Sequence, residues 1–142
     1  MVVENLNEIE LAFQKMLAQG NGKSDRTDGL GMHVLADFGG CQIVPDKADD
    51  LEQTMVKAAE LCKATVVNTT FHEFNPIGLS GVVVIAESHL AVHTWPEHGA
   101  VCIDLFTCSH EMDPTRALEF LFETFGARTM ELERVTRGRG AK

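Results

Sequence analysis

Four strand-like segments follow one another between residues 65 and 108, and this run limits the possible folds more than any other feature. Each segment is rich in β-branched, aromatic or aliphatic residues, as half-buried and buried strands are. The four segments are residues 65–74, 81–86, 89–95 and 101–108. Turn-forming sequences follow the first and third segments, at Asn75-Pro76-Ile77-Gly78 and Pro96-Glu97-His98-Gly99. We therefore expect this run to build the centre of a mainly antiparallel sheet.

Helices are predicted on both sides of this run. Apolar residues at helical spacing predict a helix over residues 48–63. A second predicted helix begins at Asp113-Pro114, a typical helix start, and ends at Gly126. Further strands are predicted at residues 32–38 and 129–135. This order predicts an α+β fold, a two-layer sandwich with helices packed on one face of the sheet. The other face needs a cover, which favours a dimer.

The first part of the chain differs from the rest. Residues 4–19 predict an amphipathic helix, and the polar, glycine-rich residues 20–31 predict a flexible linker. We therefore divide the chain into an N-terminal extension of helix and linker, residues 1–29, and a compact domain, residues 30–142.

Charge and hydropathy argue against several classes of function. The 142-residue chain has 12 Lys and Arg against 21 Asp and Glu, a formal net charge of −9. Because phosphate binding needs clustered basic side chains, we do not expect a nucleic-acid-binding protein. No apolar stretch approaches the about 20 residues of a membrane span, and no secretion signal is recognisable. We expect a cytoplasmic protein without membrane association, whose four cysteines are reduced.

Reactive side chains gather in the central run. Five of the six histidines lie between positions 72 and 110, among hydroxyl, carboxylate and thiol groups. The set comprises His72, His89, His93, His98, His110, Ser80, Ser88, Glu87, Glu97, Cys102 and Cys108. Such groups can perform acid–base and nucleophilic chemistry. Histidines and cysteines on neighbouring strands could also bind zinc, but no standard ligand spacing is present, and we predict no metal site.

The junction Glu87-Ser88-His89 is unusual. Two strand-like stretches meet there without any Gly, Pro, Asn or Asp to turn the chain. Either one long strand continues through the junction or something breaks it, and periodicity does not distinguish these possibilities.

A long motif around this junction resembles one protein family. Residues 79–108, which include the run Glu87-Ser-His-Leu-Ala-Val-His-Thr-Trp-Pro-Glu97, resemble the core of the bacterial and archaeal S-adenosylmethionine decarboxylases. The resemblance extends over residues 30–139 and includes Gly31-Met-His-Val-Leu-Ala-Asp-Phe and Thr70-Phe-His-Glu-Phe.

The resemblance implies a proenzyme that cuts itself between Glu87 and Ser88. The Ser88 hydroxyl would attack the Glu87 carbonyl, and the resulting ester would break by β-elimination. The dehydroalanine left at position 88 would then hydrolyse to a pyruvoyl group and ammonia. Cleavage would give an 87-residue β chain and a 55-residue α chain (142 − 87) that starts with the pyruvoyl cofactor. Ser80 and His93 match family positions that assist this processing.

The resemblance also implies roles in the reaction. The pyruvoyl ketone would form a Schiff base with S-adenosylmethionine and draw electrons from the bond to the departing CO₂. Cys108 matches the family's proton donor, Glu97 a residue that binds the ribose hydroxyls, and Phe74 an aromatic residue that stacks on adenine. The product would be the aminopropyl donor of spermidine synthesis. In the family, both protomers of a homodimer contribute to the active sites.

Two alternatives stay open. Met32 and His98 stand where the family usually has a basic residue and a tyrosine. Some relatives keep the pyruvoyl machinery and decarboxylate L-arginine or L-ornithine, which the processing residues do not distinguish. The other alternative is an unprocessed, non-catalytic relative.

Overall fold

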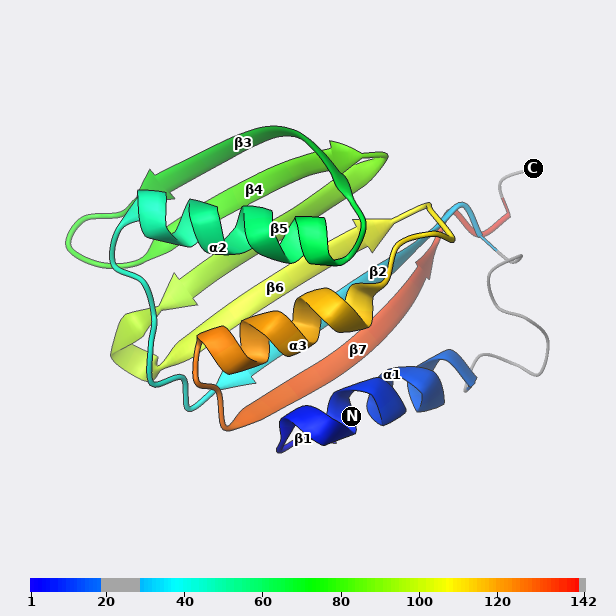
Figure 1. The fold of residues 1–142 in the computed structure, drawn as a ribbon, viewed down its shortest axis with the longest axis horizontal. Helices are drawn as coiled ribbons and strands as arrows, with labels where there is room; N and C mark the ends of the chain where they lie inside the picture. The colour runs from blue at the N-terminus through cyan, green and yellow to red at the C-terminus, as the bar shows by residue number, and fades with distance from the viewer. Residues whose placement is uncertain (19–28, 141–142) are drawn as a thin grey trace.

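A single antiparallel sheet with helices on one face organises the chain, as the computed structural model shows for residues 1–18 and 29–140 (Figure 1). In the described residues, seven strands are hydrogen-bonded in the order β1-β7-β2-β6-β5-β4-β3. They are β1 (Val2–Val3), β2 (Gly31–Gly39), β3 (Thr65–Glu73), β4 (Leu79–Ala86), β5 (Ser88–Trp95), β6 (Ala100–Thr107) and β7 (Thr129–Arg137). The predicted fold class is confirmed.

Three α-helices cover one face of this sheet in the described residues (Figure 1). They are α1 (Ile9–Ala18), α2 (Ala48–Leu61) and α3 (Pro114–Thr124), with 3-10 turns η1 (Leu6–Glu8) and η2 (Pro96–His98). Helix α3 begins with a proline, whose missing N–H costs nothing at that position. Leu118 and Leu121 of α3 are fully buried against the sheet and its neighbouring helices. None of the described helices is long and apolar enough to cross a membrane.

Strand alternation separates a helix-covered face from an open face. In β6, Val101, Ile103 and Leu105 are buried under the helices, whereas Cys102 and Phe106 point to the other side and are half-buried. The same alternation in β4 leaves Val82 and Val84 exposed on the open face at 37% and 42%. The helix-covered side therefore holds the core, and the open side holds apolar as well as reactive groups.

The N-terminal segment packs onto this sheet. Strand β1 pairs with the edge of β7, and α1 buries Ile9 and Phe13. The helix predicted over residues 4–19 is present, but it begins at Ile9 after the turn η1. Strand β1 was not predicted, because two residues have no measurable period. Of the linker predicted over residues 20–31, residues 20–28 lie outside the described residues, and Gly31 is the first residue of β2 rather than part of a linker.

The chain turns at the Glu87-Ser88 junction. Ile85 of β4 pairs with Ser88 of β5, so Ala86 and Glu87 form a two-residue connection between antiparallel strands. Of the two possibilities left by periodicity, the broken strand is therefore correct. The turn sets Glu87 at an exposed tip and Ser88 at the first position of a central strand.

Candidate active site

Ser88 and Cys108 lie at the same end of the sheet. His89 pairs with Phe106, so one step further along this antiparallel register Ser88 faces Thr107, the residue before Cys108. The Ser88 Oγ is buried and has no hydrogen-bond partner among the described residues. Cys108 is exposed just beyond the end of β6. The predicted cleavage site and the predicted proton donor thus lie at the same end of the adjacent strands β5 and β6.

Hydrogen bonds order the loop that begins at Cys108. The buried Thr107 Oγ1 accepts a bond from the Ser109 backbone N–H at 3.0 Å and lies 3.2 Å from the Met112 Sδ. The Ser109 Oγ accepts a bond from the Glu111 N–H at 3.1 Å. Because both neighbours of Cys108 are held in this way, the backbone that carries its thiol has a defined path.

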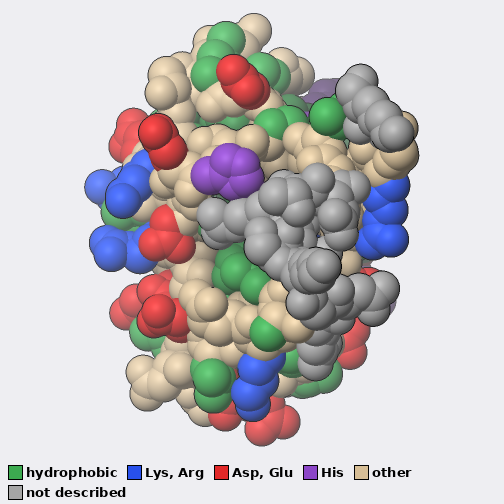
Figure 2. Space-filling view, turned by 90° about the vertical axis from the view of Figure 1, so that its right-hand side faces the viewer, with side chains coloured by type: hydrophobic (Ala, Val, Ile, Leu, Met, Phe, Trp, Pro, Cys, Tyr) green, Lys and Arg blue, Asp and Glu red, His purple; other side chains and the backbone are tan. Residues whose placement is uncertain are grey.

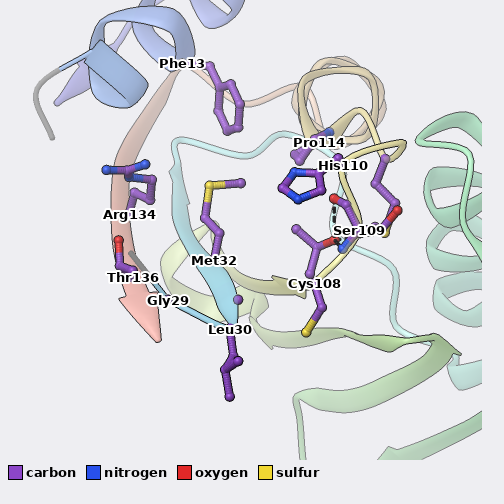
Figure 3. A pocket seen from close by; sticks show the side chains of 13 residues that line it. Phe13, Gly29, Leu30, Met32, Cys108, Ser109, His110, Pro114, Arg134 and Thr136 are labelled. Carbon is purple, nitrogen blue, oxygen red and sulfur yellow. Dashed lines mark hydrogen bonds between the residues drawn. The ribbon is translucent and has the colours of Figure 1, made fainter. Parts of the chain in front are cut away.

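A small pocket lies beside Cys108, on the side of the sheet that α1 covers (Figure 3). Its volume is about 80 Å³. Phe13 reaches in from α1, Arg134 lines it from β7, and Met32 lies between β7 and the loop that carries His110. The Cys108 sulfur points away from His110 and Met32. Figure 2 shows this end of the molecule, with hydrophobic side chains and a histidine toward the middle and both acidic and basic side chains toward the margin.

The other predicted site residues lie at the opposite end of β5. Ser80 pairs with His93 across β4 and β5, and the Ser80 Oγ lies 2.8 Å from the His93 Nδ1. Phe74 follows β3, is 51% exposed and meets the ring of His72 edge to face at 4.8 Å. Glu97 is exposed in η2, immediately after β5. Sequence reasoning selected Ser80 and His93 together, and the fold brings them within hydrogen-bond distance.

The Ser88–Cys108 pair and the Ser80–His93 pair are far apart in one chain. Ser88 and His93 are the first and sixth residues of β5, which at about 3.3 Å per residue separates them by about 16 Å. His93 and Ser80 point to the open face. Within one protomer, therefore, the Ser80–His93 pair does not reach the Glu87-Ser88 bond.

A third cluster, which sequence reasoning missed, occupies the open face next to Ser88. The rings of His33, His89 and Phe106 lie with their centroids 5.8 to 6.1 Å apart. Asp104 Oδ1 lies 3.4 Å from the His33 Nε2, and Arg137 Nη1 lies 3.3 Å from the His33 Nδ1. The parity of His89 and Phe106 was readable from their strands, but the pairing of His33 with Phe106 depends on a long-range register.

The other three thiols differ from Cys108 in their surroundings. Burial raises the pKa of the Cys41 and Cys62 thiols from 9.0 to about 11. Burial also raises the pKa of Cys102 to about 12, and its hydrogen bond to the Asp37 carboxylate adds to the shift. These thiols stay protonated near neutral pH, which agrees with packing roles. Within residues 1–18 and 29–140, no three metal-ligating side chains gather in one group.

Comparisons with known proteins point to one family. The profile of the S-adenosylmethionine decarboxylase family matches residues 32–138. An S-adenosylmethionine decarboxylase proenzyme of Thermotoga petrophila is 48% identical over 111 residues, which cover 78% of this chain and 85% of that protein. A proenzyme of the same name from Pseudomonas aeruginosa is 43% identical over 114 residues, covering 78% and 70%. The crystal structure of the adenosylmethionine decarboxylase from Aquifex aeolicus VF5 has a TM-score of 0.67 and 30% identity, covering 79% of this chain and 93% of that one. This chain therefore belongs to the S-adenosylmethionine decarboxylase family.

Proposed function

We propose that this protein is a self-processing, pyruvoyl-dependent decarboxylase of the cytoplasm. It converts S-adenosylmethionine to its decarboxylated form, the aminopropyl donor for spermidine synthesis. Membership of the family supports the reaction, and the residues at matching positions support the mechanism. Ser88 is the precursor of the pyruvoyl group, Ser80 and His93 assist cleavage after Glu87, and Cys108 donates the proton that replaces CO₂.

The position of Ser88 carries this proposal. Its hydroxyl is buried at a chain turn and has no hydrogen-bond partner among the described residues, so no such bond restrains it from attacking the Glu87 carbonyl. The surroundings therefore fit a pyruvoyl group made from this side chain. That group supplies an electron sink for the loss of CO₂. Cys108, near Ser88 and exposed, holds a proton on Sγ for the substrate α carbon.

The distance between the two groups of site residues supports a homodimer. One protomer would supply Ser88 and Cys108, and its partner would supply the Ser80–His93 pair from its own open face. Trp95, Val84 and Val135 are 40 to 42% exposed on that face, as expected of apolar groups that a second copy covers. Phe74 and Glu97 lie at the same end as Ser80 and His93, where they would receive the adenosyl part of the substrate.

Intact-mass spectrometry of the purified protein tests the processing step. We expect two chains, residues 1–87 and 88–142, with the second beginning in a pyruvoyl group. The Ser88→Ala variant should remain one chain, because it has no hydroxyl to attack Glu87. A wild-type protein that stays whole after long incubation would refute the mechanism and favour a non-catalytic relative.

A substrate comparison tests the reaction. The cut enzyme is incubated separately with carboxyl-labelled S-adenosylmethionine, L-arginine and L-ornithine. We expect labelled CO₂ from S-adenosylmethionine alone, since Phe74 and Glu97 suit an adenosyl group. Release from arginine or ornithine without release from S-adenosylmethionine would replace the proposed substrate and leave the pyruvoyl chemistry intact.

A further inference from the structure

The cluster of His33, His89 and Phe106 has no part in the mechanism above, although it adjoins the cleavage site. His89 is the residue directly after Ser88, on β5. Its ring stacks on Phe106 of β6, with the centroids 5.9 Å apart and the planes at 20°. The edge of His33 from β2 meets both rings, at 6.1 and 5.8 Å and at 82°. Three neighbouring strands thus contribute one ring each to a compact aromatic group.

The charged side chain of Arg137 contacts two members of this aromatic group. Arg137 places its Cζ 6.0 Å from the centre of the Phe106 ring and its Nη1 3.3 Å from the His33 Nδ1. Because a guanidinium only donates, the His33 Nδ1 accepts, and a neutral His33 ring carries its proton on Nε2, facing Asp104. The side chain of His33 is only 19% exposed. The His33 Nε2 has no hydrogen-bond partner among the described residues, so the ring is held by its contact with Arg137 and by the neighbouring rings of Phe106 and His89.

Cleavage changes what holds residue 88. In the uncut chain, peptide bonds restrain Ser88 on both sides. After cleavage, residue 88 is a chain end, and ends are the least ordered parts of a fold. Its conversion to a pyruvoyl group also removes the backbone N–H that could have bonded to the sheet. The remaining covalent link runs through the peptide bond to His89.

We propose that His89 is a positioning residue, whose ring, stacked on Phe106 and set against His33, holds the newly formed cofactor end in place after self-cleavage. The inference rests on the proposed function. In this role His89 acts through the packing of its flat ring and transfers no proton. A planar ring without nitrogen should therefore serve equally well. A misplacement of about 1 Å in a reacting group can cost on the order of 100-fold in rate.

Variants of His89 test this assignment by two separate measurements. The fraction of cut chain comes from intact mass, and kcat is expressed per pyruvoyl-bearing chain. We expect His89→Ala to be cut to completion, with kcat lowered roughly 10- to 100-fold and KM changed less than about threefold. His89→Phe should keep kcat within about threefold of wild type, because it can stack on Phe106. Val67→Ala is the control, since Val67 is 64% exposed on β3 and belongs neither to the aromatic cluster nor to the apolar groups assigned to the dimer face, so it should leave kcat within about threefold of wild type.

The double variant His89→Ala/Phe106→Leu separates positioning from general destabilisation. If both residues act through one stacked pair, kcat of the double variant should be no lower than that of His89→Ala. Losses that multiply would contradict a shared role, as would a His89→Ala enzyme with wild-type kcat. A His89→Phe enzyme as slow as His89→Ala would show that the imidazole itself is needed and would overturn the inference. These outcomes leave the proposed function standing, whereas a wild-type chain that is never cut would refute both.

Discussion

Cys108 is exposed at the end of β6, whereas Cys62 is buried at the end of α2 and Cys41 and Cys102 are half-buried. A thiol reacts as its thiolate, so a raised pKa protects it. The pKa of about 11 for Cys41 and Cys62 lowers their thiolate fractions at pH 8 by about 100-fold relative to a thiol at 9.0. At the scale of single residues, burial therefore makes three of the four thiols slow to react, and only the Cys108 thiol is exposed to reagents.

Limited alkylation with iodoacetamide at pH 8 checks this division. We expect Cys108 to be modified first, with Cys41, Cys62 and Cys102 modified at least about tenfold more slowly. The sign follows from the raised pKa, because Cys41 and Cys62 become reactive only as the pH rises toward 11 and Cys102 only as it rises toward 12. Mass spectrometry of peptides gives the rate at each position, and urea-unfolded protein, in which all four should react, is the control. Equal rates at Cys41 and Cys108 in the folded protein would contradict the assignment.

Helix α1 is an element whose sequence lies outside the region matched to the family, residues 32–138. It nonetheless buries Ile9 completely and leaves Phe13 only 4% exposed, against β7 and α3. Leu11 on the opposite side of the same helix is 56% exposed. At the scale of elements, the periodicity that predicted this helix also indicates that one side of it has a packing partner.

Two alanine variants on α1 measure how much this packing contributes. Phe13→Ala should lower the free energy of unfolding by about 3 kcal/mol, because it removes a buried ring and leaves a cavity. Leu11→Ala should change it by less than about 0.5 kcal/mol, since its side chain is largely in solvent. Equilibrium urea unfolding of the Ser88→Ala protein, which stays one chain, gives both values. Equal stability of the two variants would mean that α1 does not pack as described.

At the scale of the whole molecule, the predicted site residues fall into two pairs that lie far apart. Ser88 and Cys108 lie at one end of the sheet, and Ser80 and His93 lie about 16 Å away along β5. A two-fold interface uses the same face of both protomers. If two open faces packed with their sheets running in opposite directions, the Ser88 end of one protomer would meet the Ser80–His93 end of the other. In the proposed mechanism, the second protomer would complete the site.

Mixed dimers test this division of labour. Ser88→Ala chains keep the Ser80–His93 pair, and His93→Ala chains keep Ser88, so neither variant alone should be cut efficiently. Co-expressed, they should give cleavage of the His93→Ala chain, which differently tagged chains make visible by mass. Two differently tagged His93→Ala chains, co-expressed, serve as the control. If the His93→Ala chain stays whole in mixed dimers, or is cut normally by itself, processing does not depend on the partner.

Much of this protein was determined by its sequence. Helical spacing of apolar residues predicted every described α-helix, and strand-like composition predicted every described strand except β1, because burial selects residue types locally. The motif around Ser88 also predicted a cleavage site, two residues that assist cleavage and a proton donor at Cys108, since the resemblance is read position by position. The turn after Ala86 was not predictable, because it contains none of the residues that usually turn a chain.

Only the tertiary structure decided which of these residues lie together. It set Ser80 against His93 and Ser88 beside Cys108, and it separated the two pairs along one strand. It also brought His33, which lies more than 50 residues earlier in the sequence, against His89 and Phe106. The physical reason is that periodicity fixes the face to which a side chain points, whereas the register between distant strands fixes its neighbours.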